Sequence, residues 1–281
     1  GVLLSAAGMF CLVFGVQEAQ HFGWDWRVWA LLASGAAAMI AFFRWQAHLS
    51  SNALVPLALF DDRNFSLAAL IISTVGFAVS TYVIPWMIYV QTVQELSPTR
   101  AALLILPSGL VSGFLSPYIG RLTNTHDPKP FAIAGLTLAA LSIGATALIT
   151  DPGVSTYWMY LISAVYGVAN SMIWGPLSMI ATRNLDPRLA GAGSSVYNTT
   201  RQIGAVIGSA AIAAMMSAQL DAKLDGGNAG PAPAQTTSAL PEFLHEPFAQ
   251  AMGASIWLPC AVIAAGAVAS CFFAKTKSWS A

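Results

Sequence analysis

The sequence predicts an all-α polytopic membrane protein, on three observations. Hydrophobic residues make up 56% of the 281 residues and charged residues only 9%, and the mean hydropathy is +0.65. Eight apolar segments follow one another along the chain, and Lys and Arg lie mostly in alternate connections between them. A soluble domain has about 25% charged residues. This chain has too few to cover its surface in water, so we expect lipid to surround most of it.

Each apolar segment is long enough to form a membrane-spanning helix, which needs about 20 apolar residues to cross a core of about 30 Å. The chain starts inside the first segment, so that segment is short, and we interpret the sequence as the C-terminal part of a longer protein. In chain order the spans are expected at residues 1–17, 28–47, 66–91, 99–120, 131–150, 156–181, 191–217 and 249–273.

The spans are expected to form two units separated by a cytoplasmic loop. Residues 1–47 would be two linker transmembrane helices, 48–65 the connecting loop, and 66–281 a six-helix bundle. The apolar residues of 54–60 predict a short helix along the membrane surface. A faint repeat displaced by 91 residues matches Gly76, Ala78, Ser80 and Pro85 to Gly167, Ala169, Ser171 and Pro176. The repeat predicts two inverted three-helix units, which are typical of secondary transporters.

The positive charges predict the orientation of the chain. Nine of the twelve Lys and Arg fall on one side: Arg44, Arg63, Arg121, Lys129, Arg183, Arg188, Arg201, Lys275 and Lys277. Lys and Arg accumulate on the cytoplasmic side of membrane proteins. We therefore expect a multi-pass protein of the inner (cytoplasmic) membrane with its C-terminus in the cytoplasm.

The third span carries an aromatic face. Tyr82, Trp86 and Tyr89 recur at helical spacing, and Pro85 removes a backbone hydrogen bond beside them. Such a face suits a cavity for flat, apolar or cationic molecules, since cation–π attraction is about 0.5–2 kcal/mol per contact. The alternative is an aromatic belt at the outer interface, which Tyr89 and Gln91 favour. Tyr82 and Trp86 lie deeper and favour the cavity.

The sixth span carries polar and aromatic side chains on one face, at Tyr166, Asn170 and Trp174. An unpaired amide near mid-membrane is costly. Asn170 is therefore expected either to bond to a neighbouring helix or to face water in the substrate cavity. These two readings stay open on the sequence alone.

The seventh span has the most polar intramembrane face, with Asn198, Arg201 and Gln202 at i, i+3 and i+4. A buried Arg at mid-helix costs about 3 kcal/mol or more, so it must meet water, a carbonyl or an acid. We expect Asn198 and Gln202 to line the cavity and Arg201 to lie at its cytoplasmic mouth. The alternative is that Arg201 snorkels to the headgroups. Two GxxxG pairs predict close helix packing: Gly204 with Gly208, and Gly109 with Gly113.

Several function classes are disfavoured. No Asp, Glu or His lies near the middle of a span, so this chain has no proton relay of its own. HExxH and GxSxG motifs and phosphate-binding glycine loops are absent, as are a basic stripe and zinc-ligand cysteine spacing. We expect a protein that is not an enzyme, with no catalytic residue, cofactor, metal or nucleic-acid partner.

Four stretches carry motifs of a known family. They are Gly15 through Gly23-Trp24; Pro56-Leu57-x-Leu59-Phe60-x-x-Arg63-x-Phe65; Leu96-Ser97-Pro98 with Leu106-Pro107 and Pro117-x-x-Gly120-Arg121-Leu122; and Ala190-Gly191-Ala192-Gly193-Ser194 with Asn198, Arg201-Gln202 and Gly204-x-x-x-Gly208-x-Ala210. On these motifs the chain resembles the C-terminal portion of a major facilitator superfamily exporter, of the fourteen-helix drug–proton antiporter (EmrB/QacA-like) type.

The resemblance implies proton-coupled export of amphiphilic drugs or other small molecules, with antibiotic resistance as its outcome. The partners it implies are the substrate, protons, membrane lipid and a missing N-terminal six-helix bundle. It also implies a cytoplasmic gate at Gly120, Arg121 and Lys129, although Asn124, Thr125 and Asp127 replace the Asp, Arg and Gly usual there. The alternatives are an exporter of an endogenous lipid, sugar or siderophore, and a non-transporting scaffold or sensor.

Overall fold

The computed structural model describes residues 2–18, 25–48, 56–223 and 240–274, and these residues form helices and short connections without a strand. The all-α prediction is confirmed. The α-helices are α1 (Val2–Glu18), α2 (Trp26–His48), α3 (Arg63–Thr92), α4 (Pro98–Thr125), α5 (Pro128–Leu148), α6 (Thr156–Thr182), α7 (Ala190–Lys223) and α8 (His245–Ser270). Short 3-10 turns lie at η1 (Leu57–Asp61), η2 (Pro187–Leu189) and η4 (Glu242–Leu244).

Local sequence signals set the starts of the central helices. Asp62 caps α3, and its carboxylate accepts a 2.7 Å hydrogen bond from the Phe65 N–H. Ser97 and Asp127 cap α4 and α5, and each is followed by a proline in the first turn. A capping side chain satisfies an N–H that has no partner within the helix, and proline there loses no hydrogen bond. The helices therefore begin where the apolar runs meet a capping residue.

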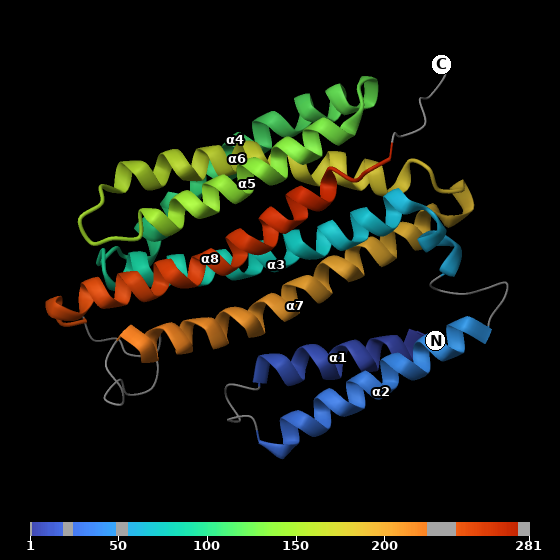
Figure 1. Cartoon of the computed structure of the whole chain (residues 1–281), viewed down its shortest axis with the longest axis horizontal. Helices are drawn as coiled ribbons and strands as arrows, with labels where there is room; N and C mark the ends of the chain where they lie inside the picture. Colours follow the sequence, from blue (N-terminus) through green and yellow to red (C-terminus); the bar gives the residue numbers. More distant parts are fainter. Residues whose placement is uncertain (1, 19–24, 49–55, 224–239, 275–281) are drawn as a thin grey trace.

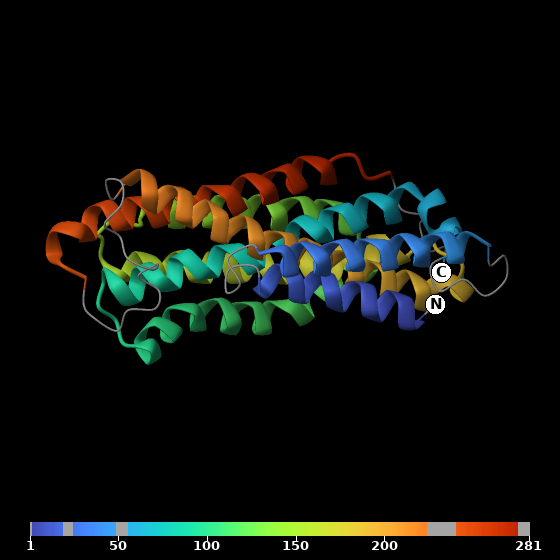
Figure 2. The ribbon, with the colours of Figure 1, turned by 90° about the horizontal axis from the view of Figure 1, so that it is seen from below.

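The helices run side by side in an elongated bundle (Figure 1). Within it, α3 packs along α7 and α8, α6 packs along α4 and α5, and α5 lies against α8. α1 and α2 pack on each other and contact the rest of the bundle beside α7 (Figures 1 and 2). The starts of α3, α5 and α7 lie together with the ends of α4, α6 and α8 at one end of the bundle, toward the right of Figure 1.

Five of the described helical segments are long and apolar enough to cross a membrane: Arg63–Thr92, Pro98–Thr125, Pro128–Leu148, Pro187–Lys223 and Glu242–Ser270. α6 has sufficient length, but its Tyr, Trp, Asn and Ser residues make it less apolar. The described apolar stretches of α1 and α2 are shorter, at Leu4–Gly15 and Trp26–Phe42. The chain is a polytopic membrane protein, and the eight-span count stays a prediction.

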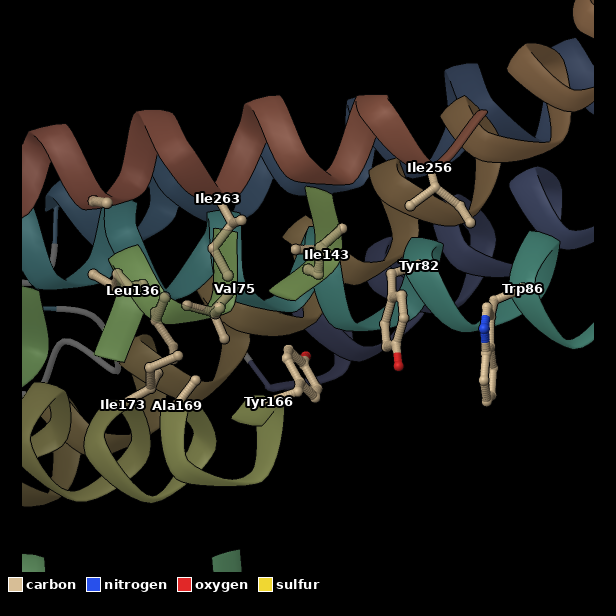
Figure 3. Close-up of a cluster of buried hydrophobic side chains, with 14 of the residues drawn as sticks. Val75, Tyr82, Trp86, Leu136, Ile143, Tyr166, Ala169, Ile173, Ile256 and Ile263 are labelled. Carbon is tan, nitrogen blue, oxygen red and sulfur yellow. The ribbon is translucent and has the colours of Figure 1, made fainter. Parts of the chain in front are cut away.

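The core is apolar and lies between the helices. Val75, Leu136, Ile143, Ile173 and Ile263 come from four helices, α3, α5, α6 and α8, and meet in it (Figure 3). Leu59 of η1 is fully buried against this core. Leu59 thus packs inward onto the bundle, whereas Phe60 in the same turn is 45% exposed. The expected position of this short helix along the membrane surface stays a prediction.

Glycine sets the close approach of α3 and α7. A methyl group on Gly204 would overlap the backbone carbonyl of Ser73, and one on Gly76 would overlap the carbonyl of Arg201. A methyl on Gly208 would lie 2.9 Å from Thr81 Cγ2. Without a Cβ at these positions the two backbones can touch. The second predicted pair differs, because a methyl on Gly109 or Gly113 would meet nothing within 4 Å among the described residues.

Candidate functional site

The aromatic face of α3 meets α6 in the bundle interior. The rings of Tyr82 and Trp86 stack with centroids 6.4 Å apart, and Tyr82 lies 5.2 Å from the ring of Tyr166 on α6. Figure 3 shows Tyr82 and Trp86 projecting side by side from α3, with Tyr166 next to Tyr82. All three are buried, and Trp86 is only 3% exposed. Tyr166 was not among the expected cavity residues, and the structure places it beside two residues that were, Tyr82 and Trp86.

Asn170 continues this row along α6. Its Nδ2 donates to the Tyr166 carbonyl at 3.1 Å, and its Oδ1 accepts a 3.0 Å hydrogen bond from Trp174 Nε1. Asn170 therefore satisfies its amide within its own helix and bonds to no neighbouring helix in the described structure. The structure therefore does not support the alternative in which Asn170 bonds to a neighbouring helix. The amide instead fixes the orientation of the Trp174 ring.

Arg201 of α7 completes the row. Its Cζ lies 5.9 Å from the centre of the Trp174 ring, which is within cation–π range. Tyr197 lies one turn earlier on α7, and its hydroxyl is buried without a hydrogen-bond partner among the described residues. We call Tyr82, Trp86, Tyr166, Asn170, Trp174 and Arg201 the aromatic–arginine row; it joins α3, α6 and α7.

The other polar residues predicted on α7 lie outside the row. Asn198 is exposed, and its Nδ2 donates to the Ser194 carbonyl at 2.9 Å. Gln202 is also exposed. Neither residue bonds to a member of the row in the described structure. Asn198 and Gln202 are connected to the row only because they lie on α7, the helix that carries Arg201.

A buried tyrosine joins the C-terminal ends of α3 and α5. The Tyr89 hydroxyl donates to the Asp151 carbonyl at 2.6 Å and accepts from Gln94 Nε2 at 2.9 Å. Tyr89 is fully buried. Its assignment to a lipid-facing aromatic belt is therefore wrong, since the side chain ties the α3–α4 connection to the α5–α6 connection.

At the opposite end, two side chains hold the C-terminal end of α8. Lys129 Nζ donates to the Phe273 carbonyl at 2.7 Å. Asn64 pairs with the backbone of Ala274, donating at 3.2 Å and accepting at 2.9 Å. A cation at a helix C-terminus also matches the helix dipole. Of the three expected gate residues, the structure gives Lys129 this contact, whereas Arg121 is exposed and a methyl on Gly120 would meet nothing within 4 Å.

Sequence reasoning missed the partners of these contacts. Asn64, Gln94 and Tyr197 were not among the expected functional residues. The helical spacing of Tyr197 to Arg201 was a usable signal, because residues four apart share a face. The Asn64 contact had no such signal, since its partner lies 210 residues further along the chain.

Comparison with known proteins decides the family. The model of the Major Facilitator Superfamily matches residues 1–209. This chain belongs to the major facilitator superfamily. Membership in this superfamily indicates a transport protein of the membrane and not an enzyme.

Relatives of this superfamily chain are named as transporters, resistance proteins or export proteins. It is 42% identical over 97% of its length to an uncharacterized MFS-type transporter of Mycobacterium tuberculosis, and covers 48% of that protein. It is 29% identical over 80% of its length to the multidrug resistance protein Stp of the same species, covering 42% of it. It is 25% identical over 99% of its length to the tetracenomycin C resistance and export protein of Streptomyces glaucescens, covering 56% of it. The chain thus spans about half the length of these relatives.

Proposed function

We propose that this chain is part of a secondary active exporter that moves amphiphilic small molecules out of the cell in exchange for protons. The observation that carries the proposal is the aromatic–arginine row, in a major facilitator chain whose relatives include named resistance and export proteins. Aromatic rings give such a surface apolar contact area, and the amide and guanidinium give it polar contacts. A surface of this kind suits molecules with both an apolar body and a polar group.

The substrate would contact α3, α6 and α7. Tyr82 and Trp86 would provide the apolar wall, and Asn170 and Trp174 the mixed polar and aromatic wall. Asn198 and Gln202 would extend this surface along α7, because both are exposed on the helix that carries Arg201. Gly120, Arg121 and Lys129 would act at the cytoplasmic end of the path.

We propose further that α3–α5 and α6–α8 are inverted repeats within a bundle of residues 66–281, preceded by linker helices at 1–47 and a connecting loop at 48–65. The packing supports this division. In such a repeat α3, α4 and α5 correspond to α6, α7 and α8. The packing of α3 on α7 and α8 then corresponds to the packing of α6 on α4 and α5, and the bundle contains both sets of contacts. Gly76 approaches α7, and Gly167 likewise approaches α4 at Ser108. These glycines are the equivalent members of the 91-residue repeat.

Proton coupling would belong to the N-terminal six-helix bundle of the full-length transporter. The described helices carry no Asp, Glu or His away from their ends. A proton moving inward yields about 2.3 kcal/mol per 100 mV of membrane potential. The basic residues gathered at one end of the bundle support a cytoplasmic location of that end, and of the C-terminus, by the positive-inside rule.

The test is transport by the full-length protein in proteoliposomes with an imposed pH gradient. Export predicts uptake of an amphiphilic dye into inside-out vesicles, driven by an acidic interior and abolished by a proton ionophore. Trp86→Ala should lower the rate, while Leu141→Ala, on the exposed surface of α5, should leave it unchanged. The proposal would be contradicted if dye uptake did not depend on the pH gradient and equalled the leakage of dye into protein-free vesicles. A panel of lipid, sugar and siderophore substrates in the same vesicles separates drug export from export of an endogenous compound.

A further inference from the structure

Arg201 is the one charged side chain more than ten residues from both ends of its helix, among the helices that the structure describes. α7 begins at Ala190, so Arg201 lies eleven residues into it. At 1.5 Å per residue this places it about 16 Å along the axis from the start of α7, a helix of 34 residues that is longer than a membrane core of about 30 Å, so Arg201 lies inside the span and not at its end. A guanidinium at this depth needs a polar or anionic partner.

The described structure gives that guanidinium no such partner. Arg201 makes no ion pair and no side-chain hydrogen bond among the described residues, and its guanidinium lies 5.9 Å from the centre of the Trp174 ring. A guanidinium carries five N–H donors in a fixed plane that matches a carboxylate or phosphate in two parallel hydrogen bonds. These donors are available to a ligand.

Neighbouring groups hold Arg201 in place and add a polar atom. Asn170 fixes Trp174 through the 3.0 Å hydrogen bond to its indole nitrogen, and Trp174 in turn supports the guanidinium. The Tyr197 hydroxyl, on the same face one turn earlier, is buried and has no hydrogen-bond partner in the part of the chain that the structure describes. Tyr197 is itself only 6% exposed. A hydroxyl can donate a hydrogen bond to an anion that the guanidinium attracts.

The same arrangement disfavours a cationic ligand. An organic cation could bind the face of Trp174 by cation–π attraction. The Arg201 guanidinium already covers that face. The mid-helix regions of the described structure carry no acidic side chain to offset this positive charge.

We propose that Arg201, with the Tyr197 hydroxyl beside it, binds the anionic group of the transported molecule, so that the substrate class is amphiphilic acids. The inference rests on the proposed export function and narrows its substrate. The aromatic rings of Tyr82, Trp86 and Tyr166 take the apolar body of the molecule, and Arg201 takes its carboxylate, sulfonate or phosphate.

The experiment compares two xanthene dyes of similar ring system, anionic carboxyfluorescein and cationic rhodamine 6G. Binding to the full-length protein in neutral detergent is measured by fluorescence anisotropy at about 0.15 M salt, where surface charges are screened beyond about 8 Å. The wild type should bind the anionic dye at least about tenfold more tightly, which is 1.4 kcal/mol. R201Q should lose most of this preference and R201K should keep part of it.

The matched control is R188Q, which removes the same charge from the exposed η2 turn and should behave as the wild type. Equal or tighter binding of the cationic dye by the wild type would overturn the inference, and this comparison needs no variant to fold. An unchanged preference in R201Q would overturn it as well. The inference would also be overturned if phosphatidylglycerol competed with the anionic dye for binding to the wild type but not to R201Q, because the bound anion would then be a lipid headgroup.

Transport separates the inference from the function on which it rests. Anion-selective binding that depends on Arg201, without transport of either dye in proteoliposomes, would refute export and leave the anion site standing. Proton-driven transport of rhodamine 6G alone would refute the anion site and leave export standing.

Discussion

Replacing Gly204 by alanine tests the close packing of α3 and α7. A methyl group at this position would overlap the Ser73 carbonyl oxygen, and it would lie 2.7 Å from the carbonyl carbon and 2.8 Å from the Ser73 hydroxyl oxygen. The nearest obstacle is backbone, which cannot rotate aside as a flexible side chain can. The two helices must therefore separate to accommodate the methyl group.

The expected cost follows from two opposing effects. Overpacking a tight interface costs about 1–3 kcal/mol, and a clash with backbone belongs in the upper part of this range. Alanine recovers about 0.5–1 kcal/mol over glycine because it has higher helix propensity. The net loss for G204A is about 1–2 kcal/mol. A loss of that size lowers Tm by about 2–8 °C for a domain of 150–250 residues.

The matched control is G109A, because Gly109 has the same GxxxG spacing but nothing within 4 Å of its methyl position among the described residues. It should be neutral or stabilised by about 0.5–1 kcal/mol. Thermal unfolding of the detergent-solubilised full-length protein, followed by the loss of the monodisperse peak in size-exclusion chromatography, measures both variants. G204A as stable as the wild type would refute the packing argument.

Other contacts make further predictions. N64A removes both hydrogen bonds to Ala274 and should cost about 1–3 kcal/mol and speed deuterium uptake at the end of α8; unchanged uptake there would count against the contact. K129M should speed exchange in the same peptide, because it removes the 2.7 Å bond to the Phe273 carbonyl. Y89F removes the 2.6 Å hydrogen bond to the Asp151 carbonyl, which keeps the 3.4 Å bond from Gln94 Nε2, and should lower stability by about 0.5–1.5 kcal/mol. Y157F is the control and should be neutral, since Tyr157 is 84% exposed. Equal Tm values for Y89F and Y157F would show that the buried Tyr89 hydroxyl contributes nothing to stability.

Helix positions were largely predictable from hydropathy and capping residues. The sixth span, expected at 156–181, is α6 at Thr156–Thr182, and the second, expected at 28–47, is α2 at Trp26–His48. The largest difference is α7, which continues to Lys223 where the span was expected to end at 217. Hydropathy marks where a helix leaves lipid, whereas residues 218–223 (Ala-Gln-Leu-Asp-Ala-Lys) include two charged residues but still favour a helix.

Contacts between distant residues were not predictable in the same way. Trp174 and Arg201 were both expected at the site. Helical spacing shows which residues share a face of one span, but it does not show which face of another span they contact. The same holds for Lys129 with Phe273, 144 residues apart, and for Tyr89 with Asp151, 62 residues apart. These pairs depend on how the helix ends assemble, so they emerge only from the folded bundle.

In the proposed exporter, the polar face of α7 beside the aromatic–arginine row lines a water-filled substrate path. Its most direct test is labelling of N198C by a membrane-impermeant maleimide, in the full-length protein with Cys11, Cys260 and Cys271 replaced by alanine. L141C, on a residue 65% exposed on α5, is the lipid-facing control. We expect that N198C reacts with the maleimide, that an amphiphilic acid slows this reaction, and that L141C stays unlabelled. A reactive L141C beside an unreactive N198C would contradict it.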